Sequence, residues 1–353
     1  MHVTTTNHVL FGIQNLKTRF LEFNYIFKMI PAPATGLSTW MLVWLEEHSK
    51  FEPWGVLIER NGDWVASAIF TRYRRFGLWH IGKPGGSCDQ LSFGAVDDDA
   101  TLMLAQVIYD TINGFGGPWE LEVPNLPWPN QMVNQIISSW PYSKTNMQYT
   151  EPCLIFVTNA PLNNYLSSNT RSSVAKAYNR IKREGIQMTQ EWIKDPEQIL
   201  NLLPQIQNIC RCRDYEKYGK SLMDDPAENR YWITFMEDNT NQGLINLFTI
   251  YLNGELAAFA LCLRDNGFIR VLTNRVSPKW STYSAGTIAN AEVVRYAFEN
   301  IHIRGVNWGA GLQRYKLSGD VTLIPLQTLC AWSSVTGRIF FILRRWFYSH
   351  FFQ

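Results

Sequence analysis

The sequence predicts an α+β protein made of two related units, each with a mixed central sheet flanked by helices. Its 353 residues exceed the size at which a single hydrophobic core stops growing, about 250–300 residues. One order of elements occurs twice: a β-hairpin, another strand, a loop rich in glycine or serine, a helix and a short strand. Asn-Gly pairs, which favour tight turns between antiparallel strands, stand in the hairpin of each copy, at 61–62 and 253–254.

The first copy combines apolar, β-branched strands with one strongly periodic helix. Asp97–Asp99 precede that helix, and acidic residues at a helix start suit its dipole. Its expected elements are a helix at Trp40–His48, strands at Trp54–Arg60, Trp64–Arg75 and Gly77–Lys83, a helix at Ala100–Ile112, and strands at Pro118–Pro127 and Cys153–Val157.

The second copy begins with a basic helix, which Ser167, Ser168 or Asn169 can cap and Gly185 can end. A Ser/Gly loop at Ser281–Gly286 precedes its last helix. Its expected elements are helices at Ser173–Gly185, Pro196–Cys212 and Pro226–Glu237, strands at Leu244–Asn253, Glu255–Asp265 and Phe268–Val276, a helix at Thr287–Asn300, and a short strand at Gly305–Gly311.

The composition excludes several classes of protein. Apolar residues make up 46% of the chain and charged residues 18%, which predicts a globular protein and not a disordered one. A net charge of +2 disfavours nucleic acid as a partner. No stretch reaches about 18 uninterrupted apolar residues and no secretory signal opens the chain, so we expect no membrane-spanning helix. The 14 Trp, 15 Tyr and 20 Phe predict thick cores, an apolar ligand cavity, or both.

The cysteines predict no metal site. Only Cys210 and Cys212 of the six are close in sequence, separated by one residue instead of the two of a metal knuckle, and no histidine lies near them. Reduced cysteines fit a cytoplasmic protein.

Three segments of the second half carry a resemblance to a known family. They are LSSNTRSSVAKAYNRIKREG, FIRVLTNRV followed by YSAGTIANAEVVRYAFE, and NWGAGLQRYKLSGD. They resemble the basic helix, the strand with its cofactor loop and helix, and the terminal Tyr-Lys signature of tandem GNAT-fold acyltransferases. That group includes cellulose-biosynthesis acetyltransferase-like proteins and Fem-type aminoacyltransferases. The resemblance spans about residues 40–330 and is less specific in the first half.

The resemblance implies two GNAT-like units, residues 1–157 and residues 158–353. The first lacks a Tyr-Lys pair after PWELEVPNLPW, so we expect it to be non-catalytic and to shape or close the acceptor site. The second would bind the acyl donor, either acyl-CoA or the phosphopantetheine arm of an acyl carrier protein.

Acyl transfer from a thioester to an amine sets requirements that residues of the second half can meet. The pantetheine arm must be held, the carbonyl polarised, the amine neutral and the leaving thiolate protonated. The strand edge Leu272-Thr273-Asn274 is the candidate for holding the pantetheine amides. The loop Ser284-Ala285-Gly286-Thr287 precedes a helix, whose outward N–H groups can accept a pyrophosphate. The same loop also fits a plain helix cap, and the pattern alone leaves both interpretations open.

Tyr315 and Lys316 follow the small-residue segment Gly309-Ala310-Gly311. The resemblance implies that Tyr315 protonates the departing thiolate, which a phenol with a pKa near about 10 can do. Lys316 would bind a phosphate or carboxylate. The structural alternatives are a packed tyrosine and a solvated lysine.

Candidates for the general base lie in CRDYEKYGK, where Asp214 and Glu216 stand among aromatic residues, because acceptor-binding acids often sit in loops. A plain solvated face explains these two carboxylates as well. Glu255, beside an Asn-Gly turn, is expected to be an exposed hairpin residue.

The end of the chain is basic and aromatic. After Asp320 there is no acidic residue, and GRIFFILRRWFYSHFFQ combines seven aromatic residues with three arginines. Completion of a core, contact with a lipid surface and the wall of an acyl-chain pocket are three interpretations that stay open.

We therefore expect a cytoplasmic N-acyltransferase that moves an acyl group, medium or long chain favoured, onto an amine such as a Lys or ornithine side chain of a peptide. Two alternatives stay open. One is a Fem-type transferase that uses aminoacyl-tRNA, and the other is a catalytically silent tandem-GNAT protein that binds a lipid or a partner.

Overall fold

The computed structural model describes residues 4–30, 33–36, 38–85, 92–335 and 337–339. Its contacts divide the chain into two compact units: residues 1–149 together with 325–353, and residues 150–324. The expected boundary after residue 157 thus differs from this division at both ends of the second unit. Because the chain returns to the first unit at Pro325, that unit is made of two segments.

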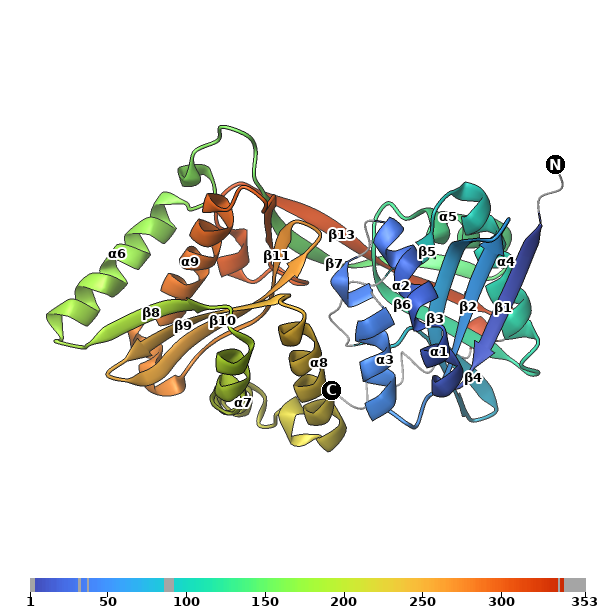
Figure 1. Cartoon of the computed structure of the whole chain (residues 1–353), viewed down its shortest axis with the longest axis horizontal. Helices are drawn as coiled ribbons and strands as arrows, with labels where there is room; N and C mark the ends of the chain where they lie inside the picture. Colours follow the sequence, from blue (N-terminus) through green and yellow to red (C-terminus); the bar gives the residue numbers. More distant parts are fainter. Residues whose placement is uncertain (1–3, 31–32, 37, 86–91, 336, 340–353) are drawn as a thin grey trace. The chain divides into compact units, whose positions relative to one another are not determined.

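The first unit is built on an almost entirely antiparallel sheet. Its strands follow the order β1-β2-β3-β4-β6-β13, with β5 beside β3, and only β4 and β6 are parallel (Figure 1). Its elements are β1 (Thr5–Phe11), α1 (Ile13–Thr18), α2 (Phe20–Met29), α3 (Ser38–Glu47), β2 (Glu52–Arg60), β3 (Asp63–Arg75), β4 (Leu78–Gly82), β5 (Gly94–Ala95), α4 (Asp98–Asn113), β6 (Trp119–Pro127), α5 (Gln131–Ser139), the start of β7 (Ser143–Ile155) and the end of β13 (Val321–Trp332).

The second unit repeats this plan. Its strands follow the order β8-β9-β10-β11-β12-β7, and only β11 and β12 are parallel. Its elements are the end of β7, α6 (Ser168–Arg183), β8 (Met188–Ile193), α7 (Pro196–Tyr218), α8 (Pro226–Asn241), β9 (Ile245–Leu252), β10 (Glu255–Asp265), β11 (Phe268–Val276), α9 (Ala285–Glu299), β12 (Gly305–Asn307) and the start of β13.

The strand that follows the parallel pair is exchanged between the two halves of the sequence. In the first unit, Leu326–Trp332 of β13 pair with β6, although β13 follows the whole second unit along the chain. In the second unit, Cys153–Ile155 of β7 pair with β12, although β7 precedes every other strand of that unit. The first sheet is therefore completed by a segment that follows the whole second unit, and the second sheet by the end of a strand that begins in the first unit.

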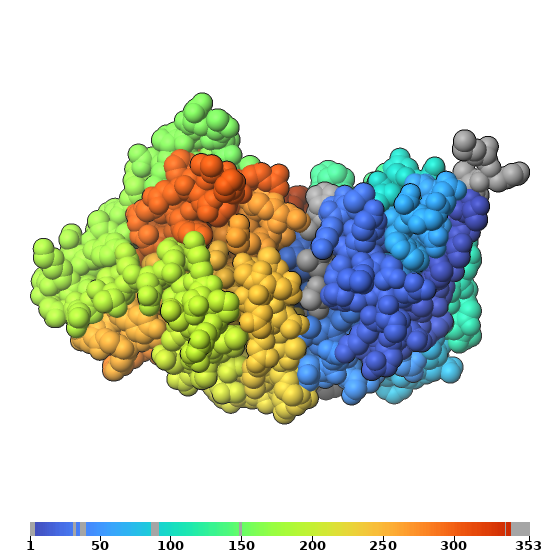
Figure 2. All heavy atoms as spheres, in the orientation of Figure 1, coloured from blue at the N-terminus to red at the C-terminus, as the bar shows by residue number. Residues whose placement is uncertain are grey.

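Helices cover both faces of the second sheet. α6 and α9 pack together, and α9 lies on β9 through β12, whereas α7 and α8 pack together on the opposite face (Figure 1). The outer flank of α6 is exposed at the edge of the space-filling view (Figure 2). Lys176, Arg180, Lys182 and Arg183 of this helix are exposed. Its buried residues, Val174, Ala177 and Ile181, recur at helical spacing on the other flank.

The α+β prediction of two sheet-and-helix units is confirmed, and most of the expected elements are present. The sequence did not predict β1, α1, α2, β5, α5, β8 or β13. Edge strands such as β8, with the sequence MTQEWI, carry exposed polar residues and lack a clear two-residue alternation. β13 contains Pro325 and pairs with residues about 200 positions away, which no local pattern signals. The aromatic segment Phe340–Phe352 lies outside the described residues.

No helix in the described residues is long and apolar enough to cross a membrane.

Gly305 marks the tightest backbone approach in the second sheet. It lies in β12 between β11 and β7, and a Cβ atom there would overlap the carbonyl oxygen of Leu154. The same atom would lie 2.8 Å from the ring of Phe268. Only glycine therefore fits where β7 meets β12.

We predict that Gly305→Ala destabilises the second unit by about 3 kcal/mol, because overpacking against fixed backbone cannot relax. Urea unfolding followed by tryptophan fluorescence measures this. Gly185→Asn is the matched control, since Gly185 has a φ of 68° that Asn tolerates, and a Cβ atom there would have no other atom within 4 Å. Equal stability of the two variants would contradict the assignment.

Candidate active site

The second sheet opens along one edge of β11. β12 pairs with β11 only at Phe268–Arg270, while β11 continues to Val276 beside β10. Leu272 is an extra residue in this strand, because Val271 pairs with Cys262 and Thr273 with Leu261. Such a bulge bends a strand and changes the direction of its side chains. The edge from Val271 to Val276 is thus free of β12 and distorted at its start.

Side chains of β11 alternate between the two covered faces. Asn274 donates from Nδ2 to Oδ1 of Asn290 on α9, 2.6 Å away, and Val276 lies against Gly286 at the start of α9. Thr273 faces α7, where it hydrogen-bonds to the thiol of Cys210. Burial raises the pKa of that thiol to about 11, so it stays protonated and inert.

A cavity of about 430 Å³ lies at this open edge. The helices α7 and α9 cover opposite faces of the sheet, and residues of both line this cavity. The cavity therefore extends from one face of the sheet to the other past the open edge of β11. It is lined by Arg213, Asp214, Lys217 and Tyr218 of α7, Asn274, Arg275 and Val276 of β11, Gly286 and Asn290 of α9, and Gln313 and Tyr315.

Tyr315 is one of two tyrosines that line this cavity, the other being Tyr218 of α7. It lies in the short 3-10 turn Arg314–Leu317, is 40% exposed, and donates its hydroxyl proton to Oδ1 of Asn274 over 3.2 Å. Trp308 packs edge-on against its ring. Burial raises the pKa of Tyr315 above its ordinary value, against smaller opposing effects of the Asn274 hydrogen bond and the Arg275 charge. The phenol therefore stays protonated at neutral pH.

The N-terminus of α9 forms the opposite wall. Ser284 precedes the helix with a φ of 56°, and its side chain makes no capping hydrogen bond. The first turn contains no acidic residue, so no side chain of the helix itself neutralises its positive dipole end. A Cβ atom on Gly286 would lie 2.6 Å from Cγ2 of Val276, so a residue with a side chain does not fit here. At this position the cavity wall is therefore formed by backbone atoms.

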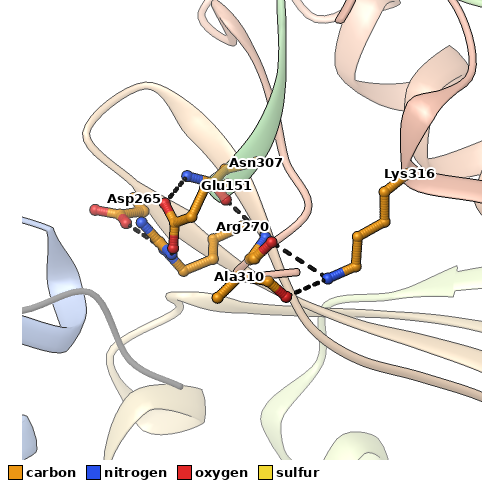
Figure 3. A network of polar contacts seen from close by, with 7 residues as sticks. Glu151, Asp265, Arg270, Asn307, Ala310 and Lys316 are labelled. Atoms are coloured by element: carbon orange, nitrogen blue, oxygen red, sulfur yellow. Dashed lines mark hydrogen bonds and ion pairs between the residues drawn. The ribbon is translucent and has the colours of Figure 1, made fainter. Parts of the chain in front are cut away.

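A buried polar network fixes the point where β11 and β12 separate (Figure 3). Arg270, the last residue of β11 paired with β12, donates from Nη1 to Glu151 over 3.1 Å and from Nε to Asp265 over 2.9 Å. The other oxygen of Glu151 accepts from Asn307 Nδ2 over 3.0 Å, and Asn307 Oδ1 accepts from the backbone N–H of Gly309 over 2.7 Å.

Lys316 extends the network to the residue beside Tyr315. Its side chain is buried, and Nζ donates to the carbonyl oxygens of Gly309 and Ala310 over 3.2 and 2.8 Å (Figure 3). The lysine therefore ties the turn that carries Tyr315 to the loop that leaves β12.

The comparisons with known proteins agree with this geometry. Residues 168–317 match the family model described as acetyltransferase (GNAT) domain. Residues 168–317 therefore carry a GNAT-type acyltransferase domain. No curated protein matches the chain.

Solved structures share the fold over both units. A conserved protein of unknown function from Bacteroides thetaiotaomicron is 12% identical, with a TM-score of 0.58 over 92% of this chain and 99% of its own. FemX is 10% identical, with a TM-score of 0.51 over 93% and 97%. The C-terminal domain of a putative lysylphosphatidylglycerol synthetase from Agrobacterium fabrum is 11% identical, with a TM-score of 0.50 over 75% and 81%. The resemblance to tandem GNAT-fold acyltransferases is confirmed.

The GNAT domain brings together some of the predicted site residues. Asp214, Asn274, Gly286 and Tyr315 line the cavity. Lys316 lies behind the Tyr315 turn with its ammonium group on backbone carbonyls. The remaining candidates, Glu216, Thr273, Ser284, Ala285 and Thr287, are not among the lining residues.

The two acids proposed as bases differ in their surroundings. Asp214 lines the cavity and accepts a hydrogen bond from the Ser221 hydroxyl over 3.0 Å. Glu216 is exposed and pairs with Arg213 at 2.5 Å. Glu255 is exposed at its hairpin, as expected, with Lys279 2.7 Å away.

The sequence did not single out Arg213, Lys217, Arg275, Asn290 or Gln313 as lining residues. The predicted helix ended at Cys212, whereas α7 continues to Tyr218 and ends at the left-handed Gly219. In a helix that continues, positions 210, 213, 214, 217 and 218 share one face, which is the signal that could have found the α7 residues.

We predict that Glu151→Gln lowers the free energy of unfolding of the GNAT domain by about 3 kcal/mol, because it removes a buried charge that compensates Arg270. Urea unfolding measures the loss. Glu255→Gln breaks an exposed ion pair and should cost less than about 1 kcal/mol. Equal losses in the free energy of unfolding for the two variants would show that the buried network stabilises the domain no more than an exposed ion pair does.

Proposed function

We propose that the GNAT domain transfers an acyl group from a coenzyme A thioester to an amine within the cavity at the open edge of β11. The observation that carries this proposal is the cavity itself, which reaches through the sheet and holds the Tyr315 hydroxyl. A donor can enter from the α9 side while an acceptor enters from the α7 side, so the two reactants meet at Asn274 and Tyr315.

The donor side has groups suited to a pantetheine and its pyrophosphate. Backbone groups of β11 beyond Arg270 have no β12 partner and can hydrogen-bond to pantetheine amides, as a neighbouring strand would. The start of α9, with no acid in its first turn and a glycine facing the cavity, can accept the pyrophosphate. The donor-binding candidates that do not line the cavity lie next to these groups: Thr273 on the free edge of β11, and Ser284, Ala285 and Thr287 at the start of α9.

The transfer step requires one proton donor and one proton acceptor. The amine nitrogen attacks the thioester carbonyl carbon, the C–N bond forms, and the C–S bond breaks with its electron pair left on sulfur. Tyr315 gives its phenolic proton to that sulfur. Asp214 accepts the proton that the amine loses, directly or through water, and solvent then restores Tyr315. Glu216 and Lys316 stay candidates for acceptor contact and for holding the Tyr315 turn, respectively.

The length of the transferred acyl chain is a more specific part of the proposal. The aromatic content of the chain favoured a medium or long chain, whereas most lining residues of the cavity are polar or charged. A cavity of about 430 Å³ that must admit both reactants supports a short acyl group, since a long apolar chain needs an extended apolar channel. Turnover with acetyl-, octanoyl- and palmitoyl-CoA distinguishes the cases. The acceptor class proposed is a primary amine, with a Lys or ornithine side chain of a peptide as one member.

The first unit is proposed to have no acyl-donor site of its own. β4 pairs with β6 through Gly82, its last residue, so the described residues show no open edge on this strand comparable to Val271–Val276. We propose instead that this unit shapes the acceptor site.

An aminoacyl-tRNA-dependent transfer is the second candidate. The fold similarity to FemX and the three cations of the cavity lining, Arg213, Lys217 and Arg275, support it. Salt-sensitive binding of tRNA, with turnover of aminoacyl-tRNA and none of acyl-CoA, would favour this candidate over the first.

We predict that Tyr315→Phe lowers kcat by about 10²–10⁴-fold with little change in KM for the donor, because it removes only the proton donor. Steady-state release of free coenzyme A measures both constants. Tyr178→Phe is the control, since that hydroxyl donates to Gln190 and does not line the cavity.

Because burial raises the pKa of Tyr315, the acid form persists through neutral pH, and its loss should limit turnover only at a pH above the ordinary pKa of a tyrosine. An unchanged kcat in Tyr315→Phe would refute the assigned role. Absence of turnover with every acyl-CoA and amine tried would refute the proposed function.

A further inference from the structure

The α7 side of the cavity, formed by Arg213, Asp214, Lys217, Tyr218 and Arg275, carries more positive than negative charge. Arg213 is paired with Glu216 at 2.5 Å, which leaves Asp214 against two cations. Within the part of the chain that the structure describes, neither Lys217 nor Arg275 has a carboxylate within 4.0 Å. The cavity therefore has an excess of one positive charge on this side.

The two unpaired cations come from different elements but meet at one cavity. Lys217 lies in the last turn of α7, with Nζ over the ring of Tyr218. Arg275 lies in β11, where Nη1 donates to the backbone carbonyl of Asn274 over 3.0 Å, and its charge acts on Cys210 of α7. An arginine presents five N–H donors in a planar fork, so most of the Arg275 donors remain for a ligand.

These cations lie on the face that the donor phosphates do not use. In the proposed function, the pyrophosphate lies at the start of α9, across the sheet from α7. A negative group that pairs with Arg275 and Lys217 therefore belongs to the acceptor. A guanidinium beside an ammonium group is the arrangement that recognises a carboxylate or a phosphate.

We propose that the acceptor carries an oxyanion in addition to its reacting amine, and that Arg275 and Lys217 bind this oxyanion while Asp214 receives the ammonium group. This inference rests on the proposed function and narrows its substrate class. A carboxylate and a phosphate have the same recognition chemistry here, so amino acids and amino-sugar phosphates are the two sources that an experiment must separate.

The test uses matched acceptors that differ only in the oxyanion. 6-Aminohexanoate is compared with hexylamine, and glucosamine 6-phosphate with glucosamine, with acetyl-CoA as donor and the full-length protein as enzyme. We expect kcat/KM to be about tenfold or more higher for the anionic member of one pair, mainly through KM, since a single charged hydrogen bond changes affinity by at least about this factor. The pair that responds identifies carboxylate or phosphate as the source.

Two variants connect the preference to the named residues. Arg275→Gln and Lys217→Gln should each reduce the ratio of kcat/KM between anionic and neutral acceptor by about tenfold, and Arg275→Lys should retain part of it. Lys182→Gln, an exposed cation on α6, should leave both the ratio and the turnover unchanged. Higher salt should reduce the ratio in the wild-type protein.

Two results separate the failures. Turnover of both members of each pair at equal kcat/KM would overturn the oxyanion inference and leave the acyltransferase proposal standing. A preference that persists in Arg275→Gln and in Lys217→Gln would also overturn the inference. Absence of turnover for every acceptor overturns the proposed function instead. Circular dichroism of each variant establishes that a lost preference is not a lost fold.

Discussion

The buried contact of Arg270 with Glu151 is the interaction on which the rest of the candidate site depends. Both side chains are withdrawn from water, and burial alone opposes the guanidinium charge. The carboxylates of Glu151 and Asp265 outweigh that effect and raise the pKa of Arg270. Since Arg270 and Asn307 form the last pair between β11 and β12, the network holds the two strands together at the point where they separate. The contacts of Asn307 with Gly309 and of Lys316 with Gly309 and Ala310 connect this network to the loop after β12 and to the Tyr315 turn. The position of the candidate site therefore depends on the network.

The network also determines the position of the Tyr315 phenol, through Lys316. Lys316 was expected to contact a ligand, but its ammonium group lies on the carbonyls of Gly309 and Ala310. A cation on these carbonyls orients the turn without entering the cavity, so the neighbouring phenol can face Asn274 in a fixed geometry. The Tyr-Lys pair thus divides into one residue that lines the cavity and one that holds the first in place. Side chains of β11 alternate between the two faces of the sheet, so Asn274 faces α9 whereas Arg275 adds its positive charge to the α7 side of the cavity.

Local sequence signals predicted much of the fold but only part of the site. The Asn-Gly turns at Asn61, Asn253 and Asn266 have the positive φ that such turns require, and Ser167 caps α6. These features depend on neighbouring residues, so a single sequence displays them. The pairing of β13 with β6 and the contact of Glu151 with Arg270 join residues more than 100 positions apart, which no local pattern records. The end of α7 was missed because the charged segment after Cys212 has the composition of a loop, and only Gly219 stops the helix.

The exchange of strands has a consequence for how this domain could have been inherited. The family match begins at residue 168, whereas Glu151 lies in β7, before that boundary. A gene segment that encoded only the matched residues would leave Arg270 without its principal counter-charge and β12 without its outer neighbour. The GNAT domain and the strand that precedes it therefore form one heritable unit, since recombination between them would separate an ion pair and two paired strands. The dependence is not symmetric: residues 150–324 form one continuous unit, whereas the first unit needs β13 from beyond that unit to complete its sheet.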